Sequence, residues 1–205
     1  MDDNHNEKEV KVILLGDSGV GKTCIINRYI NNTYNPNSRT TLGSNASSKS
    51  VKRGHASYIL NLWDTTGQEK YHSITNLFIK GSNIVVLVYS IDSLTSFKGL
   101  DYWYKSVNEK LEGNKYVLAV VGSKYDLIKN EEEEVSEEEV KKFAEEKNAL
   151  FKLVSSKEDP EGINDLFDTL LDELLKKNYL SEDENENENY IIDRRKIKKK
   201  KKNFC

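Results

Sequence analysis

The stretch Gly16-Asp17-Ser18-Gly19-Val20-Gly21-Lys22-Thr23 matches the pattern G-x-x-x-x-G-K-[ST] and directly follows the apolar run Val10–Leu15. A buried strand that ends in a glycine-rich turn, with a helix opening beyond it, points backbone N–H groups inward around a phosphate. In this pattern the lysine ammonium reaches phosphate oxygens and the threonine hydroxyl binds Mg²⁺. Because the amphipathic segment Cys24–Ile30 follows the turn, we expect a phosphate-binding loop rather than a glycine-rich turn without a ligand.

A second block, within Leu60–Tyr71, supplies groups that suit the far end of a nucleotide. Asp64 follows a hydrophobic strand, where its carboxylate can contact Mg²⁺ directly or through water. Gly67 has no side chain to clash, so its N–H can approach a γ-phosphate. Gln68 can position a water molecule beside that phosphate.

Two later blocks indicate which base is bound. In Gly122-Ser123-Lys124-Tyr125-Asp126, which follows the apolar run Val117–Val121, the Asp126 carboxylate can accept hydrogen bonds from the ring N–H and the exocyclic amine of guanine. Adenine offers no such pair of donors. The block Ser155-Ser156-Lys157 follows the apolar run Leu150–Val154 in the same way.

These four blocks, in this order and spacing, resemble the small GTPases of the Ras superfamily over about residues 9–177. Within the superfamily the sequence is most similar to Rab proteins. Only 28 residues separate Asp126 from Ser155, too few for the extra helix of Rho proteins, and the polar segment Met1–Glu9 lacks the amphipathic anchor of Arf proteins. The Rab-like segments are Leu60–Thr65, Lys70–Thr75, Phe78–Ser82 and Tyr89–Phe97.

The apolar runs alternate with helical patterns, which predicts an α/β fold: a doubly wound, mostly parallel six-stranded sheet with helices on both faces, as in a P-loop GTPase G domain. The polar segment Ser47–Arg53 is expected as an antiparallel edge strand, and Ser136 with Glu139 has the pattern of a helix capping box. We expect a solvated loop at Glu131–Glu134. Strands are expected at Val10–Leu15, Tyr58–Trp63, Ile84–Tyr89, Val117–Val121 and Leu150–Val154, and helices at Thr23–Ile30, Thr95–Leu111, Ser136–Asn148 and Ile163–Lys177.

The resemblance implies a role for each site residue. Gln68, Lys22 and Thr41 are the expected catalytic residues, with Thr40 as the second choice for the threonine of the first switch loop. Thr23, Thr41 and Asp64 are expected to hold Mg²⁺. Tyr34 would pack edge-on to the guanine, and the Ser156 N–H would bond its exocyclic oxygen. The expected nucleotide-binding residues are Asp17, Ser18, Gly19, Val20, Gly21, Lys22, Thr23, Cys24, Tyr34, Gly67, Ser123, Lys124, Asp126, Ser155, Ser156 and Lys157.

The sequence departs from the family at several places that bear on function. Ser18 lies where Ras proteins have Gly but serine is common in Rab proteins, so we expect it to leave hydrolysis intact. Ser123 stands where the family has Asn, and a hydroxyl cannot bridge both base and phosphate loop as an amide can. Thr66 replaces the usual Ala, which adds bulk beside Gly67. Rab effectors generally contact three aromatic side chains, and here the positions fall on Trp63, Phe78 and Ala46, so we expect ordinary Rab effectors to bind weakly. Alternatively, Trp63 and Phe78 are core residues.

At 205 residues with a net charge of −3, the chain is expected to hold one domain at 9–178, an N-terminal extension at 1–8 and a flexible tail at 179–205. Two cysteines give no disulfide framework, and Cys24 is expected to be a small core residue. No signal peptide or long apolar run is present, so we expect a cytosolic protein without a membrane-spanning segment.

Charge in the tail is strongly segregated. Ser181–Asn189 carries five acids and no base, whereas Tyr190–Cys205 carries eight bases and one acid. The resemblance to Rab proteins makes Cys205 the expected prenylation site and implies peripheral attachment to the cytosolic face of intracellular membranes. The four-residue prenylation box is absent, however, and the alternative is a solubilising tail with an inert thiol. No aromatic residues interleave with the lysines, so no nucleic-acid binding is expected.

Three functions compete on these grounds. The first is a monomeric GDP/GTP switch that slowly hydrolyses GTP, regulates vesicle traffic, and works with an exchange factor, a GTPase-activating protein and effectors. The second is a nucleotide-bound interaction module that cycles poorly and acts as a scaffold. The third, a P-loop ATPase or small-molecule kinase, is disfavoured because Asp126 follows Lys124 and no substrate lid is evident.

Overall fold

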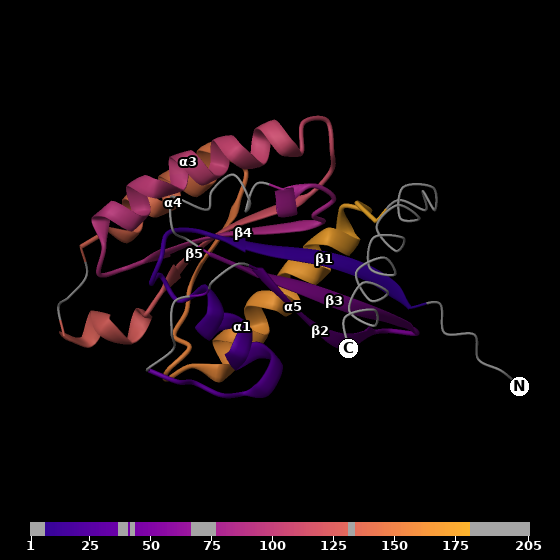
Figure 1. Cartoon of the computed structure of the whole chain (residues 1–205), viewed down its shortest axis with the longest axis horizontal. Coiled ribbons are helices and arrows are strands. Elements are labelled where there is room, and N and C mark those ends of the chain that lie inside the picture. The colour runs from indigo at the N-terminus through magenta and orange to yellow at the C-terminus, as the bar shows by residue number, and fades with distance from the viewer. Residues whose placement is uncertain (1–6, 37–40, 42–43, 67–76, 131–133, 181–205) are drawn as a thin grey trace, which may run out of the picture.

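A computed structural model describes residues 7–36, 41, 44–66, 77–130 and 134–180 of the chain. Six strands form one sheet in the order β2-β3-β1-β4-β5-β6 (Figure 1). All neighbours pair in parallel except β2 and β3, which form an antiparallel hairpin at the edge. The strands are β1 (Lys8–Leu15), β2 (Ser44–Arg53), β3 (Ala56–Thr65), β4 (Ile84–Ser90), β5 (Val117–Ser123) and β6 (Leu150–Leu153).

Continuous apolar runs form the central strands, because helices cover both faces of the sheet. Every residue of β4 and of β5 is buried. β2, in contrast, is polar and lies at the open edge, where only one neighbour is available. It begins at Ser44, three residues before the start expected from the sequence, and its antiparallel pairing is as expected.

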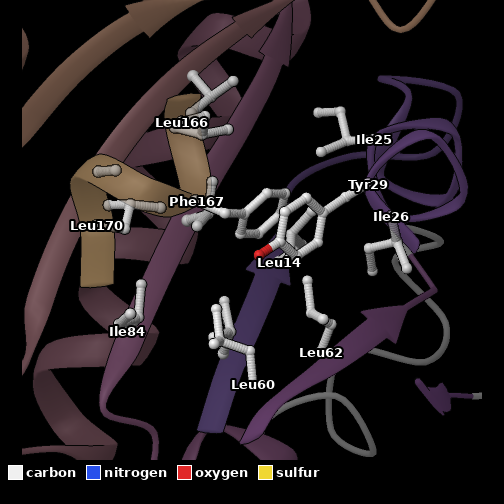
Figure 2. Packing of buried hydrophobic residues seen from close by; sticks show 14 of the residues in the cluster. Leu14, Ile25, Ile26, Tyr29, Leu60, Leu62, Ile84, Leu166, Phe167 and Leu170 are labelled. Carbon is white, nitrogen blue, oxygen red and sulfur yellow. The ribbon is translucent and has the colours of Figure 1, made fainter. Parts of the chain in front are cut away.

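One face of the sheet is covered by α1 (Lys22–Asn31) and α5 (Pro160–Lys176). Figure 2 shows apolar side chains of both helices, such as Ile25 and Leu170, around the same core as Leu60 and Leu62 of β3, and all four belong to one buried cluster. The rings of Tyr29 and Phe167 stack between the two helices, with 4.1 Å between their centroids. This contact fixes α1, and with it the loop that leads into α1.

The other face is covered by α3 (Leu94–Lys110) and α4 (Glu137–Glu146) (Figure 1). Trp103 of α3 is fully buried in this layer. The Ser136 hydroxyl accepts a hydrogen bond from the Glu139 N–H and so caps α4, as the capping-box pattern predicted. Of the acidic stretch Glu131–Glu134, only Glu134 is described, and its carboxylate accepts a hydrogen bond from the Leu94 N–H at the start of α3.

The strand order reverses at β1: the chain adds β2 and β3 on one side of it and then crosses to β4 on the other side. Such a reversal opens a crevice beyond the carboxyl end of the strand, where ligands bind in open α/β sheets. The glycine-rich turn Gly16–Gly21 follows β1 directly, and a short 3₁₀ helix, η2 (Tyr125–Asn130), follows β5 at the same edge. The doubly wound fold expected from the sequence is therefore confirmed, and it brings the predicted blocks to one edge.

Within the part of the chain that the structure describes, no helix is long and apolar enough to cross a membrane. The proposed extension and tail largely fall outside the described residues, so the domain boundaries at residues 8 and 178 stay predictions.

Candidate nucleotide site

Two glycines allow the loop after β1 to fold as it does. Gly16 has φ +146°, and a Cβ there would lie 2.0 Å from the carbonyl oxygen of Val88 in β4, which no side chain can tolerate. Gly21 is the residue that precedes α1, with φ +97°. No side chain caps the N-terminus of α1. Its first N–H groups therefore stay available to an anion, and the helix dipole adds partial positive charge there.

Lys22 is a buried cation at this turn. Its ammonium donates to the carbonyl oxygens of Gly16, at 2.6 Å, and of Asp17, at 2.7 Å. Burial lowers the pKa of Lys22 to about 8, although the nearby carboxylates of Asp64 and Asp17 act in the opposite direction. An ammonium has a third N–H to donate, and an anion in front of it would favour the charged form.

Asp64, at the end of β3, gathers two hydroxyls around one of its oxygens. Oδ2 accepts hydrogen bonds from Thr23 Oγ1 at 2.8 Å and from Thr41 Oγ1 at 3.3 Å, and the two hydroxyl oxygens are themselves 2.8 Å apart. Oδ1 is buried without a hydrogen-bond partner, and burial raises the pKa of the carboxyl, against the lowering effect of Thr23, Lys22 and Thr41. A buried carboxylate oxygen without a partner fits a cation beside it.

The donor set of this cluster suits Mg²⁺. Two hydroxyls and a carboxylate are hard oxygen ligands, which Mg²⁺ prefers, and it keeps waters for its other positions. The described residues hold no group of three or more His, Cys, Asp or Glu side chains that could bind a metal.

Asp126, in η2, is held by the loop after β6. Ser155 Oγ donates to Asp126 Oδ1 at 2.6 Å and in turn accepts from the Glu158 N–H at 3.0 Å. Lys157 Nζ lies 3.7 Å from Asp126 Oδ2, but half of the Lys157 side chain is exposed, so this ion pair contributes little. The serine bond fixes the carboxylate while leaving lone pairs of both oxygens for a ligand.

Ser123 links the end of β5 to the phosphate loop. Its Oγ lies 2.5 Å from the carbonyl oxygen of Val20 and 2.9 Å from that of Tyr89, and the side chain is buried. The hydroxyl therefore reaches the phosphate loop. This is one of the two contacts, to the phosphate loop and to the base, that the resemblance implies for an asparagine at this position. Lys124, next in the chain, has φ +60°, and its ammonium lies 3.4 Å from the Asp92 carboxylate.

A cavity of about 560 Å³ lies in front of these groups. Four predicted residues are not among those that line the cavity, namely Asp17, Val20, Asp64 and Ser155, and Gly67 and Gln68 lie outside the described residues. Of the residues predicted to bind nucleotide or metal, those that line it are Ser18, Gly19, Gly21, Lys22, Thr23, Cys24, Tyr34, Thr41, Ser123, Lys124, Asp126, Ser156 and Lys157.

The sequence predicts Cys24 both as a small core residue and as a nucleotide-binding residue, and the structure contradicts the first of these predictions. We expected a small core residue on the first helix, but its side chain is only partly buried and lines the cavity. It lies two residues after Lys22, on the turn of α1 that opens toward the crevice, so the helix directs it to the site rather than to the sheet. Its place among the cavity residues agrees with the site prediction.

Sequence reasoning missed residues that shape the site from other elements. Arg28 of α1 donates from Nε to the Ser156 carbonyl oxygen at 2.7 Å and from Nη2 to that of Lys157 at 3.3 Å. The indole N–H of Trp103 donates to Asp17 Oδ1 at 3.0 Å. Neither Arg28 nor Trp103 belongs to a recognisable sequence motif, and only the fold brings these two residues to the site. Four further lining residues were also not predicted: Asn35, Pro36, Thr65 and Leu127.

Beside the cavity, the structure brings together the positions expected to contact effectors. Ala46 pairs with Trp63 across the β2–β3 hairpin, and Trp63 stacks on Phe78 with 5.2 Å between ring centroids. Both rings are only partly buried, and they pack on the core cluster under α3. The neighbouring Leu77 is 72 % exposed. Trp63 and Phe78 thus contribute to the core and also present apolar surface.

Comparison with known proteins agrees with this geometry. The sequence model of the Ras family matches residues 11–176. Mouse Ras-related protein Rab-17 is 37 % identical over 167 residues, which span 82 % of this chain and 76 % of that protein. Ras-related protein Rab-11B of Dictyostelium discoideum is 36 % identical over 87 % of this chain and 81 % of its own length. Ras-related protein SEC4 of Saccharomyces cerevisiae is 34 % identical over a region that spans 78 % of this chain and 73 % of that protein. The chain therefore belongs to the Ras family, as a Rab-like small GTPase that binds guanine nucleotides and hydrolyses GTP.

Proposed function

We propose that this protein is a GDP/GTP switch that acts in membrane traffic, as Rab proteins do. One observation supports the switch most directly. A single cavity is bounded at one end by the buried ammonium of Lys22 and the uncapped start of α1, and at the other by the Asp126 carboxylate. This distribution of charge matches a guanine nucleotide, with its phosphates at the positive end and its base at the negative end.

The phosphates would contact the N–H groups of Gly16–Thr23, with Lys22 as their charged partner. Mg²⁺ would be held by the hydroxyls of Thr23 and Thr41 with Asp64 behind them, and it would neutralise charge on the phosphate oxygens. Lys22 would stabilise the charge that develops on the terminal phosphate as it departs, and a bound Mg²⁺ would supply further positive charge there.

Hydrolysis needs a water molecule in line with the terminal phosphate, and we assign its orientation to Gln68, with the Gly67 N–H on the phosphate. Both residues are assigned from the sequence motif. Thr41 would connect the reaction to the switch, since its hydroxyl would help to hold Mg²⁺ when the terminal phosphate is present. Loss of that phosphate would free the two loops that contain Thr41 and Gln68.

A nucleotide-bound module that cycles poorly is the second candidate. One observation favours it: Thr66, which stands where the family has Ala, is 2 % exposed and immediately precedes Gly67. A side chain enclosed so closely restrains the segment that has to move. The measured rate of GTP hydrolysis separates the two candidates, because a scaffold would bind nucleotide with hardly any turnover.

We infer that the partners of the switch are an exchange factor, a GTPase-activating protein and effectors. Effectors would use the partly exposed rings of Trp63 and Phe78, with polar contacts along β2 where other Rab proteins offer a third ring. The basic stretch Arg194–Lys202 and Cys205 would attach the protein peripherally to the cytosolic face of a membrane; both lie outside the described residues.

Asp126→Asn should change which base is bound. Guanine loses a charged acceptor for its two donors, so we expect GDP affinity to fall about a hundredfold or more. The affinity for xanthosine diphosphate should rise, because the asparagine amide can donate to the carbonyl that replaces the amine of guanine. Titration of full-length protein with both nucleotides checks this, with Asp101→Asn on the exposed side of α3 as the control. Unchanged GDP affinity would remove Asp126 from the base site.

Gln68→Leu should slow the chemical step and leave binding intact. We expect the single-turnover rate of GTP hydrolysis to fall roughly tenfold or more, because the water molecule loses the group that orients it. GTP affinity, measured separately with a non-hydrolysable analogue, should stay within about twofold. A rate equal to that of the wild type would mean that another group positions the water.

Trp63→Ala should weaken effector capture by the GTP-bound form. Tryptophan is enriched among the minority of interface residues whose truncation costs more than about 1 kcal/mol of binding free energy. Pull-down with Gln68→Leu protein loaded with a non-hydrolysable analogue checks this, and Tyr102→Ala on α3 is the matched control, since Tyr102 is 41 % exposed. Capture that is indifferent to Trp63→Ala in a folded protein, or strong binding of ordinary Rab effectors, contradicts the proposal.

Cys205→Ser should abolish attachment to membranes. The native protein should show the mass of a lipid on its last residue, and the variant should move from the membrane to the soluble fraction on centrifugation. Cys24→Ser, which removes the other cysteine, should leave both readouts as they were. An unmodified Cys205 together with unchanged fractionation of Cys205→Ser would refute the anchor.

A further inference from the structure

The Ser123 hydroxyl is committed to the protein interior. The residue is 2 % exposed, and its Oγ faces two carbonyl oxygens, those of Val20 and Tyr89, at 2.5 and 2.9 Å. A carbonyl oxygen can only accept, and a hydroxyl has a single hydrogen to donate. Whichever carbonyl takes that hydrogen, the hydroxyl offers only lone pairs to a ligand in the cavity.

Ser123 lies between the base end and the phosphate end of the site. Asp126 follows it by three residues, and its hydroxyl bonds to Val20 in the phosphate loop. On the other side, a Cβ built on Gly21 would lie 3.6 Å from Ser123 Oγ. Ser123 also lines the cavity itself. Ser123 is therefore the polar side chain of β5 that would face the side of the base nearest the phosphates.

The proposed function, on which this inference rests, sets the Watson–Crick edge of guanine against Asp126. The imidazole ring is at the opposite side of the purine and also bears the ribose, so N7 is on the side toward the phosphate loop. N7 is an acceptor without a hydrogen, so only a donor can recognise it. The neighbouring Lys124 ammonium lies beside the Asp92 carboxylate, 3.4 Å away, and so is paired with another group.

We propose that this protein does not recognise N7 of the base, and that Ser123 is the residue that removes this element of specificity. Base selection then rests on the edge of guanine that faces Asp126. Guanine nucleotides altered at position 7, in which a C–H group replaces N7, are ligands as good as the natural ones. An asparagine at position 123 would restore recognition, because its amide has two hydrogens, one for Val20 and one for N7.

The test compares GDP with 7-deaza-GDP on the full-length protein in the presence of Mg²⁺, by competition against a fluorescent GDP analogue. We expect equal dissociation constants within about twofold for the wild type. Ser123→Asn should prefer GDP by about five- to tenfold, the effect of one neutral hydrogen bond. Ser123→Ala is the control: it leaves Val20 without its partner and weakens both nucleotides, but their ratio should stay near one.

The inference is overturned if the wild type prefers GDP several-fold, because the protein would then recognise N7. Loss of that preference in Ser123→Ala would identify the hydroxyl as the donor, and its persistence would identify another group. The inference is also overturned if Ser123→Asn, still folded and binding GDP, shows no preference, since position 123 would then not face N7. Failure of the proposed function has a different signature: neither nucleotide would bind to any of the three proteins.

Discussion

The buried ammonium of Lys22 is the constraint around which the site is organised. A lysine with 5 % of its surface exposed needs acceptors, and the chain supplies them by wrapping the carbonyls of Gly16 and Asp17 around it. Gly16 must then run against the Val88 carbonyl in β4, where no Cβ fits. The same wrapping leaves the start of α1 uncapped. The positive charge that makes the loop bind an anion is therefore also what determines the shape of the loop.

The helices hold this loop from behind. Trp103 of α3 donates to the Asp17 carboxylate, and Gly99, one turn earlier, lets that carboxylate approach so closely that a Cβ would lie 2.6 Å from Oδ2. On the other face, Arg28 of α1 binds the backbone of the loop after β6, which presents Ser155 to Asp126. The phosphate end and the base end are thus each fixed by a residue from a different layer, and the cavity between them keeps its width.

Local chemistry explains what could be predicted from the sequence. The phosphate loop, the Asp126 block and the buried strands are contiguous patterns, and fold topology alone brings them to one edge. Arg28 and Trp103 could not be predicted, because their partners lie 128 and 86 residues away in the chain and neither contact has a sequence signature. The early start of β2 at Ser44 has a similar cause: pairing with Thr65 extends a segment that lacks strand character of its own. For Gln68 and Cys205, which lie outside the described residues, the sequence remains the only guide.

The β2–β3 hairpin has two ends with different physical properties. At its turn, Arg53 donates to Asp168 at 2.7 Å and to Asp172 at 2.6 Å, and these contacts join the hairpin to α5. Each of these exposed ion pairs is weak on its own, but the two pairs share the Arg53 guanidinium and together restrict the turn. At the open end, Thr41 and Asp64 share the proposed metal cluster, one residue from Trp63. If the terminal phosphate controls Thr41, its loss acts on the end of the hairpin that presents Trp63, while the turn stays bound to α5. The proposed effector surface around Trp63 would then respond to the nucleotide without any rearrangement of the sheet.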